Sequence, residues 1–145
     1  MLGKCFIVLV LLVGFLRAAG CVGPVETAVV EQVIDGDTIV IAGSEHVRYI
    51  GVDAPEVGEP FYLEAKQFNE RMVVGKRVRL ERDVSDRDSY GRLLRYVYVD
   101  GIFVNGELVR NGYAFAKRYP PDTKYQEYLE EMEREAKRLR KGPWQ

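Results

Sequence analysis

Two short runs of alternating apolar residues, one on each side of Gly43-Ser44, constrain the fold more than any other feature of the sequence. The runs span Thr38–Ala42 and His46–Val52. Alternation with a period of two is typical of half-buried strands, and a break that contains glycine between two such runs predicts a β-hairpin. Pairing of the runs would gather, at one end of a small sheet, the four carboxylates that flank them: Asp35, Asp37, Asp53 and Glu56.

Four carboxylates held close together need a positive partner, because like charges repel and raise each other's pKa. A site with oxygen ligands alone favours a hard divalent cation such as Ca²⁺ or Mg²⁺. The alternative is that Asp35-Gly36-Asp37 is only a turn with solvated acidic side chains, which is a common use of an Asp-Gly pair. The basic residues of the chain favour the first interpretation.

Two arginines complete the pattern. Arg48 lies within the second apolar run, and Arg92 follows the turn Asp88–Gly91 just before a stretch rich in tyrosine and valine. Guanidinium groups bind phosphate oxygens through paired hydrogen bonds and stay charged at any relevant pH. Two arginines beside a divalent cation therefore predict a binding site for a phosphate group.

The remaining periodicities predict the other elements of one domain. Further strands are expected at Thr27–Ile34, Lys76–Glu81 and Leu93–Val99, with a tight Asp100-Gly101 turn after the last of these. Helices are expected over Glu59–Val74, from an Asn105 cap to Arg110, and after a Thr123/Gln126 capping box, with Trp144 packing back onto the domain. Five strands, a helix between the third and fourth, and helices at the end predict an α+β domain with the layout of an OB-fold β-barrel.

The chain resembles the staphylococcal nuclease family, the thermonucleases, in the order, type and spacing of three segments: Ile34 to Val40, Arg48 to Glu56 and Asp88 to Tyr96. The resemblance covers the chain from about Thr27 to Trp144. It implies an OB-fold, Ca²⁺-dependent phosphodiesterase. Such an endonuclease cleaves the bond to the 5′ oxygen in both DNA and RNA, leaves 3′-phosphate ends, and prefers single-stranded or frayed substrate.

The resemblance also implies which residues bind the metal ion. Asp37 and Asp53 correspond to the two carboxylates that hold Ca²⁺ in the family, and the backbone carbonyl oxygen of Ala54 is a further ligand. The family often has threonine in place of Ala54, but alanine should serve because the ligand is a main-chain atom. Water and substrate phosphate would complete the six to eight oxygens that Ca²⁺ takes. Asp35 is expected to shape the turn or to take part in the outer shell of the metal site.

Three residues correspond to the catalytic groups of the family. Glu56 resembles the glutamate that orients or deprotonates the attacking water. Arg48 and Arg92 resemble the pair that neutralises the phosphate while negative charge builds in the transition state. Because a carboxylate is a weak base, positioning and charge stabilisation should supply most of the acceleration.

Tyrosines are the predicted contacts to the rest of the substrate. Tyr90 resembles a family tyrosine that touches a neighbouring phosphate, and Tyr113 and Tyr119 are candidates to stack on a base. Ser89 stands where a lysine is common in the family, and the tract after Ala116 is shorter than in the staphylococcal enzyme. The sequence therefore leaves open which tyrosine stacks.

The amino terminus reads as an export signal. Residues 1–20 contain Lys4, an apolar run from Cys5 to Leu16 and small residues before Cys21, a pattern typical of a secretory signal peptide, with a plain membrane anchor as the alternative. Cys21 is in the position of a lipoprotein cysteine, although the usual leucine three residues before it is replaced by Ala18. Residues 21–26 form a short linker and residues 27–145 the nuclease domain. The predicted location is extracellular, or anchored through lipid to the outer face of the cell membrane.

Charge limits how the domain can bind nucleic acid. Removal of residues 1–20 takes away Lys4 and Arg17 and no acidic residue, so the formal charge changes from −1 to −3. Binding must then depend on local arginines and the metal ion, because bulk attraction to phosphate requires a basic protein. A single domain of this length is expected to be a monomer. The rival hypothesis is a non-catalytic OB-fold module that binds nucleic acid or protein.

Overall fold

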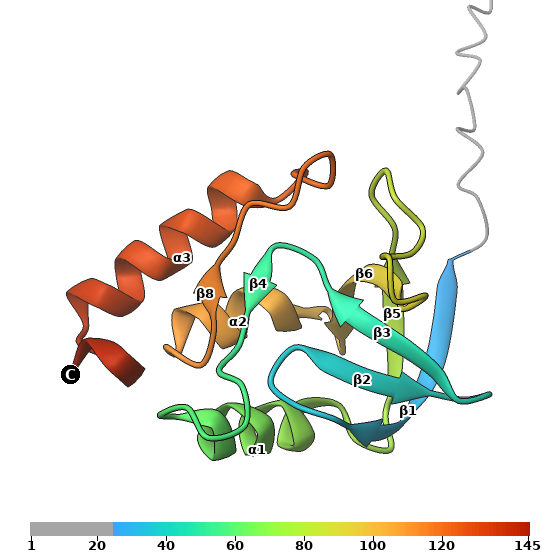
Figure 1. Ribbon diagram of the computed structural model, residues 1–145, viewed down its shortest axis with the longest axis horizontal. Helices are drawn as coiled ribbons and strands as arrows, with labels where there is room; N and C mark the ends of the chain where they lie inside the picture. Colours follow the sequence, from blue (N-terminus) through green and yellow to red (C-terminus); the bar gives the residue numbers. More distant parts are fainter. Residues whose placement is uncertain (1–24) are drawn as a thin grey trace, which may run out of the picture.

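The structure, a computed structural model, describes residues 25–145, and all structural statements concern this part of the chain (Figure 1). The predicted signal peptide, Cys21 and most of the linker lie outside the described residues. Within the described part, no helix is long and apolar enough to cross a membrane.

Eight strands and three α-helices are found in the described residues, followed by a short 3₁₀ helix. The strands are β1 (Glu26–Val33), β2 (Thr38–Ile41), β3 (Glu45–Tyr49), β4 (Val52–Asp53), β5 (Arg77–Glu81), β6 (Leu93–Val99), β7 (Ile102–Phe103) and β8 (Phe115–Ala116). The helices are α1 (Tyr62–Val73), α2 (Val104–Arg110), α3 (Gln126–Arg138) and the 3₁₀ helix η1 (Gly142–Trp144).

Five of the strands close into a barrel. Their order is β3-β2-β1-β5-β6, and β3 also pairs with β6 in parallel, which joins the two edges of the sheet. β7 extends β6, while β4 and β8 form a separate two-stranded ribbon. Figure 1 shows the barrel at one side of the molecule, α1 below it, and α3 at the other side beyond the β4–β8 ribbon. This architecture confirms the predicted OB-fold barrel with a helix between its third and fourth strands.

The barrel interior is filled by β-branched and other apolar side chains. On β5, Val78 and Leu80 are buried while the intervening arginines point outward, as alternation along a strand requires. β2 differs because all four of its residues are buried. The barrel core is formed by apolar residues of the strands that alternation predicts, among them Val30, Val33, Ile39, Val47, Val78, Leu80 and Val97.

The third predicted strand is shorter than expected. It ends at Tyr49, because Gly51 adopts a left-handed conformation with φ 78° and turns the chain. A side chain is also excluded at Gly51, since an added Cβ would lie 2.6 Å from Cδ1 of Leu129. The next residues, Val52 and Asp53, therefore leave the barrel and pair with β8 instead.

Two predicted helix caps are wrong. Asn105 lies inside α2, and its buried side chain joins β6 to the turn after β3: Nδ2 donates to the carbonyl of Ile50 (2.9 Å), and Oδ1 accepts from the amide of Val97 (3.0 Å). The capping box at Thr123 is also absent, because α3 begins after Tyr125 and no side chain caps it. The side chain of Gln126 donates to Glu130 within the helix instead.

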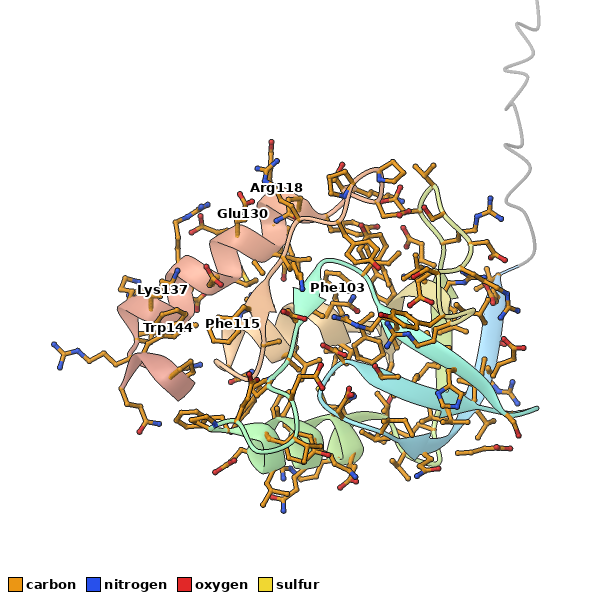
Figure 2. All side chains as sticks on the ribbon, viewed as in Figure 1. Phe103, Phe115, Arg118, Glu130, Lys137 and Trp144 are labelled. Carbon is orange, nitrogen blue, oxygen red and sulfur yellow. The ribbon has the colours of Figure 1, made fainter. Side chains whose placement is uncertain are left out.

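The last helix packs against the domain by one face, as predicted. Leu129, Met132 and Ala136 are buried. Trp144 folds back as expected, and its ring meets that of Phe115 edge to face, with centroids 5.5 Å apart (Figure 2). The carboxyl-terminal end of the chain therefore packs against Phe115 of the β4–β8 ribbon.

Candidate active site

The turn between β1 and β2 carries the first acidic residues of the site. Asp35 shapes this turn, because its Oδ1 accepts a hydrogen bond from the amide of Asp37 (3.0 Å). Gly36 permits close packing, since an added Cβ would lie 2.6 Å from the Cβ of Ala54 and 3.0 Å from that of Ala65. The turn therefore rests directly against the segment that follows Asp53.

Arg48 is the centre of the site. In the β2–β3 register Thr38 lies opposite Arg48, so the hairpin itself brings Arg48 next to Asp37. The guanidinium is buried, and its Nη1 donates to the carbonyl of Val52 (2.8 Å). Its Nη2 contacts Oδ2 of Asp37 and Oδ1 of Asp53, both at 3.1 Å. Because the two carboxylate oxygens share one nitrogen, they lie no farther apart than twice that distance.

Asp37 is buried among groups that donate to it. Its Oδ2 accepts from the amide of Ala54 (2.7 Å), and its Oδ1 accepts from the hydroxyl of Thr38 (3.1 Å). Burial raises the pKa of Asp37 to about 7, and the charge of Asp35 adds to the rise. Arg48 and the two hydrogen bonds act in the opposite direction and do not outweigh burial. A further positive charge near Asp37 would favour its ionised form.

Asp53 faces solvent on the ribbon, and its second oxygen has a basic partner. Oδ2 of Asp53 lies 3.0 Å from Nζ of Lys117, and both side chains are about half exposed. Sequence reasoning missed Lys117. It reaches Asp53 only because β4 pairs with β8, and strands of two residues have no recognisable periodicity.

Arg92 is held by the loop that precedes β6. Asp88 is nearly inaccessible; its Oδ2 accepts from Nε of Arg92 (2.7 Å), and its Oδ1 accepts from the amides of Tyr90 and Arg92. Although burial raises the pKa of Asp88, the hydrogen bonds from Arg92 outweigh it and the net shift is downward. The parallel register of Val47 with Leu93 places Arg92 beside the β2–β3 hairpin.

The other predicted site residues divide into two groups. The first group is exposed. Tyr90 is 84% exposed, and the centre of its ring lies 5.4 Å from the guanidinium carbon of Arg92. Glu56 is also exposed, two residues after Ala54. Within residues 25–145 the Glu56 carboxylate makes no hydrogen bond or ion pair, while its amide donates to Glu59 (2.7 Å).

The other two predicted tyrosines pack against the domain. Tyr113 packs its ring against Phe68, with centroids 4.8 Å apart, and Tyr119 packs against the cluster around Ile50. His46 is exposed on β3, where it lines a surface hollow together with Arg92.

The chemistry of the donor set fits a hard cation. Among residues 25–145, no three side chains of the types His, Cys, Asp and Glu lie close enough to hold a metal ion by themselves. The predicted set has only two carboxylates, Asp37 and Asp53, and one main-chain oxygen, that of Ala54. These oxygen groups suit Ca²⁺, which accepts backbone carbonyls and water alongside carboxylates.

Comparison with known proteins identifies the family. The family model described as "Staphylococcal nuclease homologue" matches residues 46–145, more than half of the chain. The chain belongs to the staphylococcal nuclease family. It is 39% identical to the thermonuclease of Staphylococcus hyicus over 128 residues, covering 82% of this chain and 76% of the relative. It is also 39% identical to the thermonuclease of Staphylococcus intermedius, with 83% and 77% coverage.

A third relative is also named as a nuclease. The chain is 39% identical over 125 residues to endonuclease YncB of Bacillus subtilis, covering 79% of this chain and 59% of that protein. The family and these relatives confirm the predicted enzyme class. The chain is a nuclease, a hydrolase of phosphodiester bonds.

Proposed function

We propose that the chain is a Ca²⁺-dependent, sugar-nonspecific endonuclease that hydrolyses DNA and RNA to products with 3′-phosphate ends. The observation that carries the proposal is the convergence of Asp37 and Asp53 on one nitrogen of buried Arg48. Two acidic oxygens beside a fixed guanidinium suit a site where a cation and a phosphate group bind next to each other.

Asp37, Asp53 and the carbonyl of Ala54 would hold the metal ion. When bound, Ca²⁺ would act as a Lewis acid on a phosphate oxygen and as a template for the substrate. Asp37 would gain most from the ion, because its burial otherwise favours the protonated carboxyl. Asp53 is already exposed on one side, so its Oδ2 can exchange Lys117 for another cation.

The catalytic work of the chain would fall on three side chains. Arg48 is fixed by four contacts to main-chain and carboxylate oxygens, so it can stabilise charge without being reoriented. Arg92 would act from the turn before β6, the parallel neighbour of β3, oriented by Asp88. The free carboxylate of Glu56 would orient the attacking water and take its proton.

Nucleic acid is the substrate that the relatives' names support, since they are a thermonuclease and an endonuclease. Of the three predicted tyrosine contacts, Tyr90 has the strongest support, because its ring is exposed beside Arg92. Tyr113 and Tyr119 would contact substrate only by their outer edges, since both rings pack against the domain. Single-stranded or frayed substrate fits a site that reads phosphate and stacks on bases.

The test is hydrolysis of denatured DNA and of RNA by the purified chain, first with Ca²⁺ and then with EGTA. We expect cleavage only with Ca²⁺, and 3′-phosphate ends on the products. Arg92→Ala and Glu56→Gln should lower kcat by orders of magnitude without unfolding the protein. Arg134→Ala is the matched control, because Arg134 pairs with Glu131 on the exposed face of α3, far along the chain from the site.

Two outcomes would remove the proposal. Cleavage that continues in EGTA would exclude the metal-dependent mechanism. Binding of oligonucleotide without cleavage under any condition would favour the rival function, a non-catalytic OB-fold binding module.

The location of the protein is a separate proposal. Residues 1–20 would be removed on export, and Cys21 would either carry a lipid that tethers the chain to the outer face of the membrane or begin a free extracellular protein. Mass spectrometry of the mature chain distinguishes the two products, since a lipid on Cys21 adds a large and characteristic mass. An intact residue 1–20 segment in the mature chain would refute both. A single domain of residues 27–145 would be monomeric, as gel filtration can test.

A further inference from the structure

One face of the β4–β8 ribbon carries three side chains that are suited to different parts of a nucleotide. Asp53 lies directly opposite Phe115 in the antiparallel register, so both point to the same side. Lys117 follows Phe115 by two residues, and its Nζ reaches Asp53 on that side. The other side, with Val52, is buried in the core. A proposed metal ligand, a cation and a phenyl ring therefore share one solvent face.

Beside this face lies an apolar hollow of about 290 Å³. Most of its lining is apolar, and Glu59 is its one charged residue. It is lined by Pro55, Glu59, Pro60, Phe61, Gly112, Phe115 and Pro143. Pro55 directly precedes Glu56, so the hollow begins one residue from the proposed catalytic carboxylate. The hollow is too apolar to hold phosphate, but flat aromatic walls of this kind suit a nucleobase.

The backbone around the hollow gives an independent sign of function. Phe61, at the start of α1, adopts a left-handed conformation with φ 67°, which favours glycine and strains a phenylalanine. Strained residues of this kind persist where the surrounding structure imposes them, and they cluster at binding sites. Phe61 is only partly buried, and Figure 2 shows Phe115 on the ribbon with Trp144 beside it. Phe115 is thus supported from one side and 37% exposed.

We propose that this hollow is a subsite for the base of the nucleotide next to the reactive phosphate, on the Glu56 side of the site. The proposal rests on the nuclease function given above. Phe115 stacks on the base, Phe61 forms the facing wall, and Lys117 contacts the connecting phosphate. Residues two apart on a strand are separated by about 6.7 Å, a span that one nucleotide bridges between its phosphate and its base. An unpaired base fits the hollow and a paired one does not, so the subsite would favour single-stranded substrate.

The experiment uses the full chain and an unpaired oligodeoxynucleotide that has one ordinary phosphodiester among phosphorothioate linkages. Three versions are compared: one with all bases, and two with an abasic residue on one or the other side of the cleavable bond. For the wild type, loss of the base on one side should lower kcat/KM about tenfold, the usual effect of losing one base–aromatic stack. Loss of the base on the other side should have a smaller effect.

Variants at the ring assign the effect to Phe115. Phe115→Ala should lower kcat/KM about tenfold on the complete substrate, mainly through KM, and should no longer respond to the abasic residue. Phe115→Tyr should behave as the wild type, because it keeps the ring. Phe115→Leu keeps apolar volume without a ring, so it should show the loss of Phe115→Ala even if that variant is less stable. Ile102→Ala is the control, since Ile102 is a similarly exposed apolar residue on β7.

The outcomes separate this proposal from the one on which it rests. No cleavage of the complete substrate by the wild type with Ca²⁺ overturns the nuclease mechanism. Cleavage by the wild type together with unchanged kcat/KM in Phe115→Ala and Phe115→Leu overturns the subsite alone. Equal sensitivity of wild type and Phe115→Ala to the abasic residue also overturns it, because the base would then be recognised elsewhere.

Discussion

Replacement of Asp37 by asparagine should stabilise the metal-free protein at neutral pH and abolish its response to Ca²⁺. Asparagine has the same shape as aspartate and can satisfy the same neighbours. Its carbonyl oxygen can accept from the Ala54 amide and Arg48, as Oδ2 of Asp37 does, while its amide group can donate to the hydroxyl oxygen of Thr38. The change therefore removes a buried charge without leaving a buried polar atom unpaired.

The size of the effect follows from the pKa of Asp37, which burial raises from 3.8 to about 7. The folded protein therefore binds a proton at Asp37 more tightly than the unfolded chain does. The contribution of Asp37 to the free energy of unfolding is therefore complete below about pH 4, and it is lost as the pH rises to about 7. Three pKa units correspond to a loss of about 4 kcal/mol, an upper bound because Asp37 is coupled to Arg48 and Asp35.

Urea unfolding from pH 4 to pH 8 in EDTA measures this difference. Wild type and Asp37→Asn should be equally stable near pH 4, and the variant should become more stable as the pH approaches 7. The comparison cancels opposite contributions from carboxyls whose pKa is lowered, such as Asp88. Added Ca²⁺ should stabilise the wild type and leave the variant unchanged. A stability difference that does not vary with pH would refute the reasoning about burial.

Three further predictions concern positioning and packing. Asp88→Ala should lower kcat about tenfold with little change in KM, because Arg92 loses the carboxylate that orients it. Steady-state kinetics measures this, and an unchanged kcat would show that Arg92 takes no part in catalysis. Asn105→Ala should lower the free energy of unfolding by about 2–5 kcal/mol, because it leaves two buried main-chain groups without a hydrogen bond. The control is Asn111→Ala at the partly exposed end of α2, which should lower the free energy of unfolding by less in the same urea titration. Gly51→Ala should cost about 2–3 kcal/mol because the position combines φ 78° with a 2.6 Å approach to Leu129, and a melting temperature equal to that of the wild type would contradict this.

The barrel could be predicted from sequence because its strands are long enough to show alternation. β6 has the predicted bounds of Leu93–Val99, and β1 differs from the prediction by one residue at each end. The same hairpin register places Asp37 beside Arg48, so half of the site follows from local pairing. The caps were predicted wrongly for a physical reason. Asparagine near the start of a helix is a common cap, but the Asn105 side chain instead binds the carbonyl of Ile50, 55 residues earlier in the chain. Only tertiary packing determines that contact.

The β4–β8 ribbon explains why the other half of the site was hidden. Each strand has two residues, and their pairing depends on the left-handed turn at Gly51 and on the return of the chain after α2. That pairing aligns Asp53 with Phe115 and brings Lys117 within 3.0 Å of the carboxylate. Lys117 and Phe115 come from a tract whose sequence shows no regular pattern, so neither could be assigned a role without the structure. Because Asp53 leaves the barrel yet still contacts Arg48, the ribbon joins the rigid barrel to the surface over which a nucleic-acid strand would pass.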